Sequence, residues 1–145
     1  MPRTAQIRVV GMTFHSAYPE SMHRLSEIIQ GSMAASIREA GDWSVLNEHG
    51  FEGPVAILKR NPLNEYDVNA IEVHVPALGA AGFVGHIPGP LAARWAPRLD
   101  RGETSVACVS AVPIDPRHPE KPGLQLDVTF HEVGCPVDPC SCNRR

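Results

Sequence analysis

The chain has 145 residues, of which 43% are hydrophobic and 20% are charged, and its formal net charge at pH 7 is −3. This length suits one domain with its own core, and the composition is that of a globular protein and excludes a disordered one. No apolar run approaches the roughly 20 residues that span a bilayer, so no membrane contact is expected. The acidic balance argues against a protein that coats duplex nucleic acid, because such proteins neutralise phosphates with a basic surface.

The two ends of the chain carry little that predicts structure. The N-terminal run MPRTAQIRVV lacks the layout of a signal peptide, so we expect a cytoplasmic protein. Three of the four cysteines fall in residues 135–145, which we expect to be a flexible tail. Their spacing departs from the C-x2–4-C pairs that hold zinc. No metal or cofactor is therefore predicted, and the weak candidates for a metal are Cys135, Cys140 and Cys142.

The first third of the chain predicts one strand and one helix. Residues 7–14, IRVVGMTF, are rich in β-branched residues and predict a strand, in which Gly11 marks a bulge or a close backbone approach. Pro19 suits the first turn of a helix. An apolar stripe at helical spacing follows it, formed by Met22, Leu25, Ile29, Met33 and Ile37. We therefore expect residues 16–53 to be a helical insertion between the first and second strands.

The remainder predicts short strands with few helices. The expected strands cover residues 55–59, 70–75, 82–87, 103–112 and 124–133. A short helix is expected at 91–99, and a Pro-rich loop at 113–123 joins the last two strands. Alternating βα units are absent, so a doubly wound parallel sheet is disfavoured. A mainly β fold with small helices, closed into an antiparallel barrel, fits this pattern best because closure removes the sheet edges.

The loop after residue 59 carries dense polar chemistry, with the sequence RNPLNEYDVN. Asn61, Pro62 and Asn69 are turn formers and are expected to shape the loop. Tyr66 next to Asp67 places a stacking face beside an acceptor: a Tyr ring can carry a base or sugar, and a carboxylate can accept a bond from a hydroxyl. The alternative is a local turn in which Asp67 bonds nearby backbone and Tyr66 packs at the rim of the core.

His86 follows Gly85 on a predicted strand and precedes a Pro-Gly-Pro entry to the helix. A lone histidine on a strand is more often structural than a ligand. Here, however, Gly85 permits a close approach to the backbone, and the helix N-terminus offers N–H groups to an anion. Arg94 and Arg98 lie four residues apart on one helix face, so they could act together.

Three segments together resemble the HIRAN domain family: VVGMTFH at 9–15, VAILKRNPLNEYDVNAIEVHV at 55–75 and GFVGHIPGPLAARWAPRL at 82–99. The resemblance implies an OB-like, six-stranded antiparallel β-barrel with small helices, covering residues 1–134. It also implies a nucleic-acid-binding module. In a family member that remodels replication forks, the domain captures the 3′-hydroxyl end of single-stranded DNA. There a Tyr stacks at the terminus, an adjacent Asp accepts the hydroxyl, and a His contacts a phosphate.

Transferred to this chain, the resemblance gives the Tyr and Asp roles to Tyr66 and Asp67 and the phosphate contact to His86. The full set of predicted nucleic-acid-binding residues is Asn64, Tyr66, Asp67, His86, Phe14 and Arg60. The sequence departs from that family member at three places. Thr13-Phe14 stands where the member has Arg-Tyr, Pro88-Gly89 replaces a basic residue, and Pro122 stands near the place of an aromatic residue.

The resemblance therefore implies a non-enzymatic domain that binds single-stranded DNA at a free 3′-hydroxyl end, in DNA repair or replication-fork processing. Such a domain would act alone or in trans with a helicase or nuclease. One alternative is a protein-interaction or regulatory domain that has lost DNA binding and uses the Met22–Ile37 stripe as its interaction face. Another is a nuclease or phosphatase, but no nucleophile elbow, phosphate loop or metal-carboxylate cluster is found in the sequence. No oligomeric state follows from the sequence.

Overall fold

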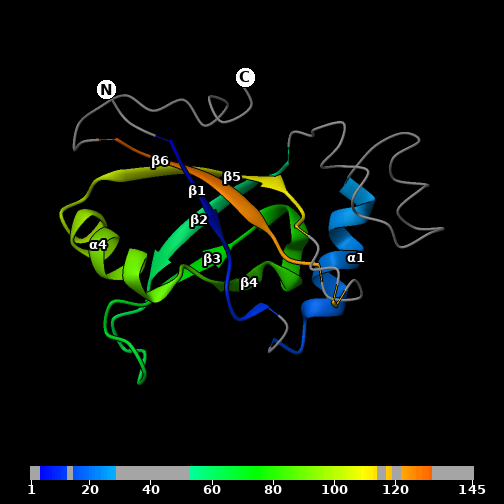
Figure 1. Cartoon of the computed structure of the whole chain (residues 1–145), viewed down its shortest axis with the longest axis horizontal. Helices are drawn as coiled ribbons and strands as arrows, with labels where there is room; N and C mark the ends of the chain where they lie inside the picture. Colours follow the sequence, from blue (N-terminus) through cyan, green and yellow to red (C-terminus); the bar gives the residue numbers. More distant parts are fainter. Residues whose placement is uncertain (1–3, 13–14, 29–52, 114–116, 119–121, 132–145) are drawn as a thin grey trace.

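The computed structural model describes residues 4–12, 15–28, 53–113, 117–118 and 122–131. Its elements, in chain order, are β1 (Thr4–Arg8), α1 (Tyr18–Ile28), β2 (Val55–Arg60), β3 (Ile71–His74), the 3-10 helix η2 (Pro76–Ala81), β4 (Phe83–His86), α4 (Gly89–Asp100), β5 (Thr104–Ala111) and β6 (Gln125–His131). The six strands form one antiparallel sheet in the order β1-β6-β5-β2-β3-β4. Figure 1 shows the sheet strongly curled, with α4 and α1 on opposite sides. This confirms the predicted mainly β, OB-like fold.

Among the described residues, the two edges of the curled sheet meet at one bridge. Val10, two residues after β1, donates its N–H to the His86 carbonyl at 2.9 Å, and His86 donates its N–H to the Val10 carbonyl at 3.0 Å. Gly85 permits this approach, because a Cβ at that position would lie 2.5 Å from the Val10 carbonyl oxygen. The close approach predicted at Gly85 is thus made by the chain's own backbone.

The first strand differs from its predicted range of 7–14. β1 pairs with β6 from Thr4 to Arg8 and then ends. Val9 donates its N–H to the Leu124 carbonyl at 3.0 Å, and the next residue already bridges to β4, on the opposite edge of the sheet. Gly11 then turns the chain with a φ of 77°. The β-branched residues Val9 and Val10 therefore lie where the two sheet edges meet and do not extend β1.

Helix α1 lies between β1 and β2 in the chain, as predicted for the insertion. Met22 and Leu25 are buried in the main core, and the Ser21 hydroxyl donates to the Ala81 carbonyl of η2 at 2.6 Å. The described part of the apolar stripe therefore faces the core. Met22 and Leu25 are packed in the core and therefore offer no surface to a partner in the alternative that makes this stripe an interaction face. Ile29, Met33 and Ile37 lie outside the described residues.

Helix α4 covers one end of the curled sheet (Figure 1) and extends beyond the predicted 91–99 at both ends. Trp95 is buried and meets Phe130 of β6 edge-on, with ring centroids 5.1 Å apart. The Arg98 guanidinium lies 4.5 Å from the centroid of the same Phe130 ring and also bonds Glu103. The Arg98 side chain therefore fastens the helix to the sheet and is not available as a free partner of Arg94.

The cysteine predictions are tested only in part. Cys108 lies in β5 and is buried, as expected for a small apolar residue. Cys135, Cys140 and Cys142 fall outside the described residues.

In the described ranges, no group of three or more His, Cys, Asp or Glu side chains is placed to hold a metal ion. No helix in the same ranges is long and apolar enough to cross a membrane.

Candidate functional site

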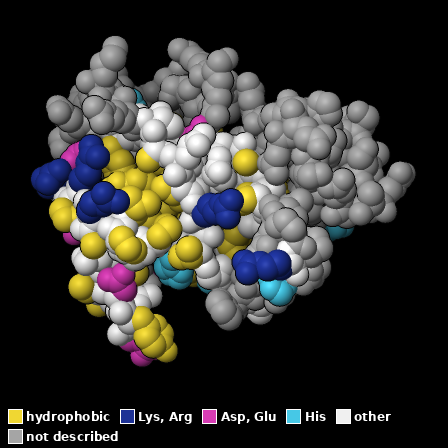
Figure 2. Space-filling model, viewed as in Figure 1, with side chains coloured by type: hydrophobic (Ala, Val, Ile, Leu, Met, Phe, Trp, Pro, Cys, Tyr) yellow, Lys and Arg dark blue, Asp and Glu magenta, His cyan; other side chains and the backbone are white. Residues whose placement is uncertain are grey.

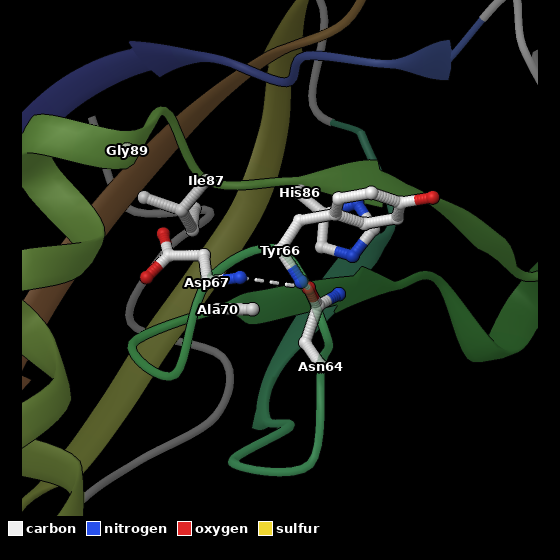
Figure 3. A pocket seen from close by; sticks show the side chains of 7 residues that line it. All are labelled: Asn64, Tyr66, Asp67, Ala70, His86, Ile87 and Gly89. Carbon is white, nitrogen blue, oxygen red and sulfur yellow. Dashed lines mark hydrogen bonds between the residues drawn. The ribbon is translucent and has the colours of Figure 1, made fainter.

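A pocket of about 260 Å³ opens where the β2–β3 loop, the end of β4 and the start of α4 meet (Figure 3). It is lined by Asn64, Tyr66, Asp67, Ala70, His86, Ile87 and Gly89. The three segments come together because β4 pairs with β3, directly beside the loop that precedes β3. The structure thus gathers four of the predicted residues around one cavity: Asn64, Tyr66, Asp67 and His86.

Side-chain hydrogen bonds fix the shape of this loop. The Asn64 Oδ1 atom accepts the backbone N–H groups of Tyr66 at 2.8 Å and of Asp67 at 3.0 Å. Asp67 Oδ1 in turn accepts the N–H of Asn69 at 2.8 Å. No described residue other than glycine has a positive φ, so these side chains shape the loop by bonding and not by left-handed backbone. The local turn considered for Asp67 is therefore present, and it uses one of the two carboxylate oxygens.

The loop presents unused chemistry to the pocket. Tyr66 is 90% exposed, so it does not pack at the rim of the core. Figure 3 shows its ring in front of the His86 imidazole, whereas the Asp67 carboxylate extends toward Ile87 and Gly89. In the described ranges, neither the Tyr66 hydroxyl nor Asp67 Oδ2 makes a hydrogen bond. An open aromatic face and an acceptor oxygen therefore line the same cavity, and they extend in opposite directions from the loop (Figure 3).

His86 contributes its backbone to the bridge between the sheet edges and its ring to the pocket. Its backbone is held by the bridge to Val10, while its imidazole faces outward beside the pocket. Burial lowers the pKa of His86 below the ordinary value; Glu72 opposes this change, and the nearby His15 and His74 add to it. The imidazole is therefore mostly neutral near pH 7, able to donate or accept one hydrogen bond.

The start of α4 forms the remaining wall of the pocket. Pro88 occupies the N-cap position, and no side chain caps the helix. Gly89, which lines the pocket, comes next in the chain. A helix N-terminus favours negative charge, whereas the Asp67 carboxylate on the opposite wall disfavours it. The pocket therefore combines one wall that attracts an anion with another that repels it.

Arg60, predicted to contact nucleic acid, does not line the pocket. Its guanidinium Nη1 donates to the carbonyls of Val68 at 3.1 Å and Ala70 at 2.9 Å. Its Nε atom donates to Asp100 Oδ1 at 3.0 Å, at the far end of α4. This geometry makes Arg60 a positioning residue, because it ties the loop to the helix that forms the other wall. Phe14, also in the predicted set, lies outside the described residues.

Replacing Arg60 by Ala should lower the free energy of unfolding by about 0.5–1.5 kcal/mol, because the part-buried Ala70 carbonyl loses a charged donor and keeps the Asn61 N–H. Ligand binding should weaken as well, since the loop loses its tether. Chemical denaturation and a binding titration measure the two effects. The matched control is Lys59→Ala, which removes the same charge from the neighbouring exposed residue and should change stability by less than about 0.5 kcal/mol. Equal losses in the two variants would mean that Arg60 acts through its charge alone.

Three rings near His86 were missed by the sequence reasoning: His15, His74 and Phe83. Phe83 lies 4.5 Å from His15, 4.9 Å from His74 and 5.4 Å from His86, measured between ring centroids. His74 could have been found, because it alternates outward with Glu72 along its strand. The other two could not, since His15 arrives from the far edge of the sheet and Phe83 depends on an irregularity in the β3–β4 pairing.

The charged surface near the pocket is uneven. Figure 2 shows basic side chains gathered over α4, next to a hydrophobic area, whereas the protruding loop carries acidic and hydrophobic side chains. Arg94, on α4, is exposed. Arg98 and Arg101 pair with Glu103, so the exposed Arg94 is the α4 side chain left to attract a negative charge on this side of the pocket.

Comparison with known proteins supports the fold. No protein-family model matches the sequence, and no curated protein matches it. Among solved structures, the HIRAN domain of human HLTF is similar at 20% identity with a TM-score of 0.50, covering 88% of this chain and 74% of that one. A protein from Lactobacillus plantarum is similar at 17% identity with a TM-score of 0.50, covering 90% of this chain and 100% of that one. The chain therefore has the fold of a HIRAN-like domain.

Proposed function

We propose that this protein is a nucleic-acid-binding module that recognises single-stranded DNA through a free 3′-hydroxyl end. The observation that carries this proposal is the pocket lined by the exposed Tyr66, by Asp67 with its unbonded Oδ2, and by His86. The HIRAN-like fold agrees with it. A role in DNA repair or replication-fork processing, with a helicase or nuclease acting in trans, is the setting we propose.

Each wall of the pocket has a distinct task in this proposal. The Tyr66 ring stacks on the terminal base or sugar, an interaction worth about 1–3 kcal/mol per base. Asp67 Oδ2 accepts the hydrogen bond of the terminal hydroxyl, while Oδ1 stays on the Asn69 N–H and keeps the carboxylate oriented. His86 and the N-terminus of α4 face the phosphate that precedes the terminal sugar. The loop built by Asn64 holds the stacking and accepting groups together.

The same arrangement explains selection for a strand end. A carboxylate repels a phosphate, so an internal nucleotide or a 3′-phosphorylated end would place two negative charges together. A free hydroxyl instead donates to the carboxylate. Selectivity therefore comes from one attractive and one repulsive interaction at the same oxygen.

A titration with short single strands tests the proposal. Strands ending in a 3′-hydroxyl, strands ending in a 3′-phosphate and duplexes with blunt ends are compared at two ionic strengths. We expect the 3′-hydroxyl strand to bind at least about 10-fold more tightly than the 3′-phosphate strand. The salt dependence should be shallow, because the pocket contacts few phosphates. Equal affinity for the two ends would contradict the proposed mechanism.

A second candidate function is a protein-interaction domain without nucleic-acid binding. It is favoured by exposed apolar side chains on β2, Val55 and Ile57, which border a hollow of about 340 Å³ between β2 and β5. These strands pair only at Val55–Cys108 and Ala56–Ala107 in the described ranges and then diverge. Absence of strand binding, together with a stable dimer or heteromeric complex in light scattering, would favour this function over the first.

A further inference from the structure

The outer face of β3 and β4 carries a ring cluster of which the proposed strand-end pocket uses only His86. We define the imidazole cluster as His15, His74 and His86 around Phe83. His15 and His86 lie nearly parallel, with ring centroids 6.2 Å apart, and all three imidazoles contact the phenyl ring. Because His86 also lines the pocket, the cluster and the pocket adjoin.

An irregularity in the sheet creates this cluster. Side chains three residues apart on a regular strand point to opposite faces, so Phe83 and His86 should not share one. The β3–β4 register shifts at Val73–His74, which pairs Phe83 with His74 and His86 with Glu72. Val84 and Gly85 are both buried between them. The shift therefore turns two rings of β4 to the surface beside the histidine of β3.

The charged groups around the cluster come from three strands and one loop. Glu72 is the carboxylate nearest to it, and its two oxygens are engaged by His74 Nε2 at 2.8 Å and Asn61 Nδ2 at 2.9 Å. Lys59 of β2 lies opposite Glu72 in the register. In the described ranges, the imidazole nitrogens of His15 and His86 make no hydrogen bond. Lys59 offsets the charge of Glu72, so each proton added to the imidazoles makes the cluster more positive.

We propose that the imidazole cluster is a proton-linked subsite in which His15 joins His86 in binding a backbone phosphate of the nucleic acid. This inference rests on the proposed function, and it adds His15 as a contact and protons as a co-ligand, neither of which the strand-end pocket requires. A phosphate beside His15 and His86 finds one N–H donor on each neutral ring, and protonation of a ring adds a second donor and a positive charge. The neighbouring Phe83 ring holds the imidazoles at a fixed spacing and supplies no competing acceptor.

The electrostatics of His86 agree with proton-coupled binding. Its pKa is lowered first by burial and also by His15 and His74, so the unliganded ring is largely neutral at neutral pH. A bound phosphate would raise that pKa, and binding would then take up protons. Affinity should therefore increase as the pH falls. Folding responds in the opposite sense: the unfolded chain binds more protons than the folded one, so stability decreases as the pH falls below about 6.5.

The test measures the affinity for a short 3′-hydroxyl strand at about pH 7.5 and about pH 5.5, on either side of the ordinary histidine pKa. Wild type should bind about 10-fold more tightly at the lower pH, which is the change expected if phosphate binding raises one histidine pKa by about one unit. The double variant His15→Gln, His74→Gln should lose most of this gain. The control His23→Gln, on the exposed face of α1, should keep it. Calorimetry in buffers of different ionisation enthalpy counts the protons taken up.

The possible results separate this inference from the proposed function. A pH dependence that is absent, or that the double variant keeps, overturns the subsite. If 3′-hydroxyl and 3′-phosphate strands bind equally but the pH dependence is lost in the double variant, the subsite stands and the strand-end mechanism fails. Inorganic phosphate is the probe independent of strand ends: it should shift the NMR signals of the His15 and His74 rings at low pH. Unchanged signals would overturn the subsite even if strands bind, and circular dichroism confirms that each variant is folded.

Discussion

Replacing Asp67 by Asn is expected to abolish the preference for a free 3′-hydroxyl while leaving the loop folded. The amide oxygen of Asn can still accept the Asn69 N–H that Asp67 Oδ1 accepts at 2.8 Å, so the local turn is retained. The second oxygen becomes an NH₂ group, which cannot accept a hydroxyl and no longer repels a phosphate. We expect the ratio of affinities for 3′-hydroxyl and 3′-phosphate strands to fall about 10- to 100-fold, the size of about 1.5–3 kcal/mol for a charged hydrogen bond.

The chain offers a matched control for this change. Glu65 is exposed on the same loop, two residues earlier, and does not line the pocket. Glu65→Gln removes the same charge from nearly the same place. It should strengthen the binding of all strands slightly and equally, without changing their ratio. If Glu65→Gln shifts the ratio as much as Asp67→Asn does, the selectivity comes from the general negative potential of the loop and not from a contact.

Gly85→Ala is expected to lower the stability of the fold strongly, because the added methyl group has no room where the two sheet edges meet. The added Cβ would lie 2.5 Å from the Val10 carbonyl oxygen and 2.6 Å from Val9 Cγ1, so the bridge that joins the sheet edges must open. Overpacking of this kind costs about 1–3 kcal/mol, measured as the free energy of unfolding in denaturant. Because His86 is the bridge partner of Val10, ligand binding should weaken in the same variant.

Two further variants show where the strain arises. Gly123→Ala is the control, because a Cβ there meets only Pro113, at 3.6 Å or more, which is an ordinary contact. It should leave stability nearly unchanged. The double variant Val9→Ala, Gly85→Ala removes the side-chain clash but keeps the clash with the Val10 carbonyl, so it should remain unstable. Full recovery in that double variant would show that side-chain crowding, not the backbone bridge, requires glycine at this position.

Much of the fold could be predicted locally. β2 starts at the predicted Val55 and ends one residue beyond the prediction, and the outward alternation of Glu72 and His74 appears as predicted. The first strand could not be predicted correctly, because IRVV is equally apolar on both sides of Arg8, and only the positions of β6 and β4 decide where the pairing changes. The role of Gly85 shows the same limit. A glycine in a strand indicates a close approach by another group, and only the closed sheet shows that this group is the Val10 backbone.

The candidate site, like the fold, could be predicted from the sequence only in part. Asn64, Tyr66 and Asp67 were predicted as a group because they lie within four residues of one another in the chain, and short-range hydrogen bonds do organise them. Arg60 was assigned to the ligand because it is basic and nearby, yet its guanidinium bonds Val68, Ala70 and Asp100. Sequence proximity does not show whether a charged side chain turns toward solvent or toward unsatisfied carbonyls.

By itself, the sequence determined the chemistry of this protein: a mainly β domain with a loop rich in acceptors, an aromatic ring next to a carboxylate and a histidine beside a helix start. Those features depend on residue type and short spacing, which operate within a few residues of the chain. The tertiary structure alone decided which groups meet. The sheet closes through Val10 and His86, α4 forms the opposite wall of the pocket, and a register shift pairs Phe83 with His74. None of these contacts follows from residue type or short spacing, because their geometry is set by how the strands pair and how the whole sheet curls.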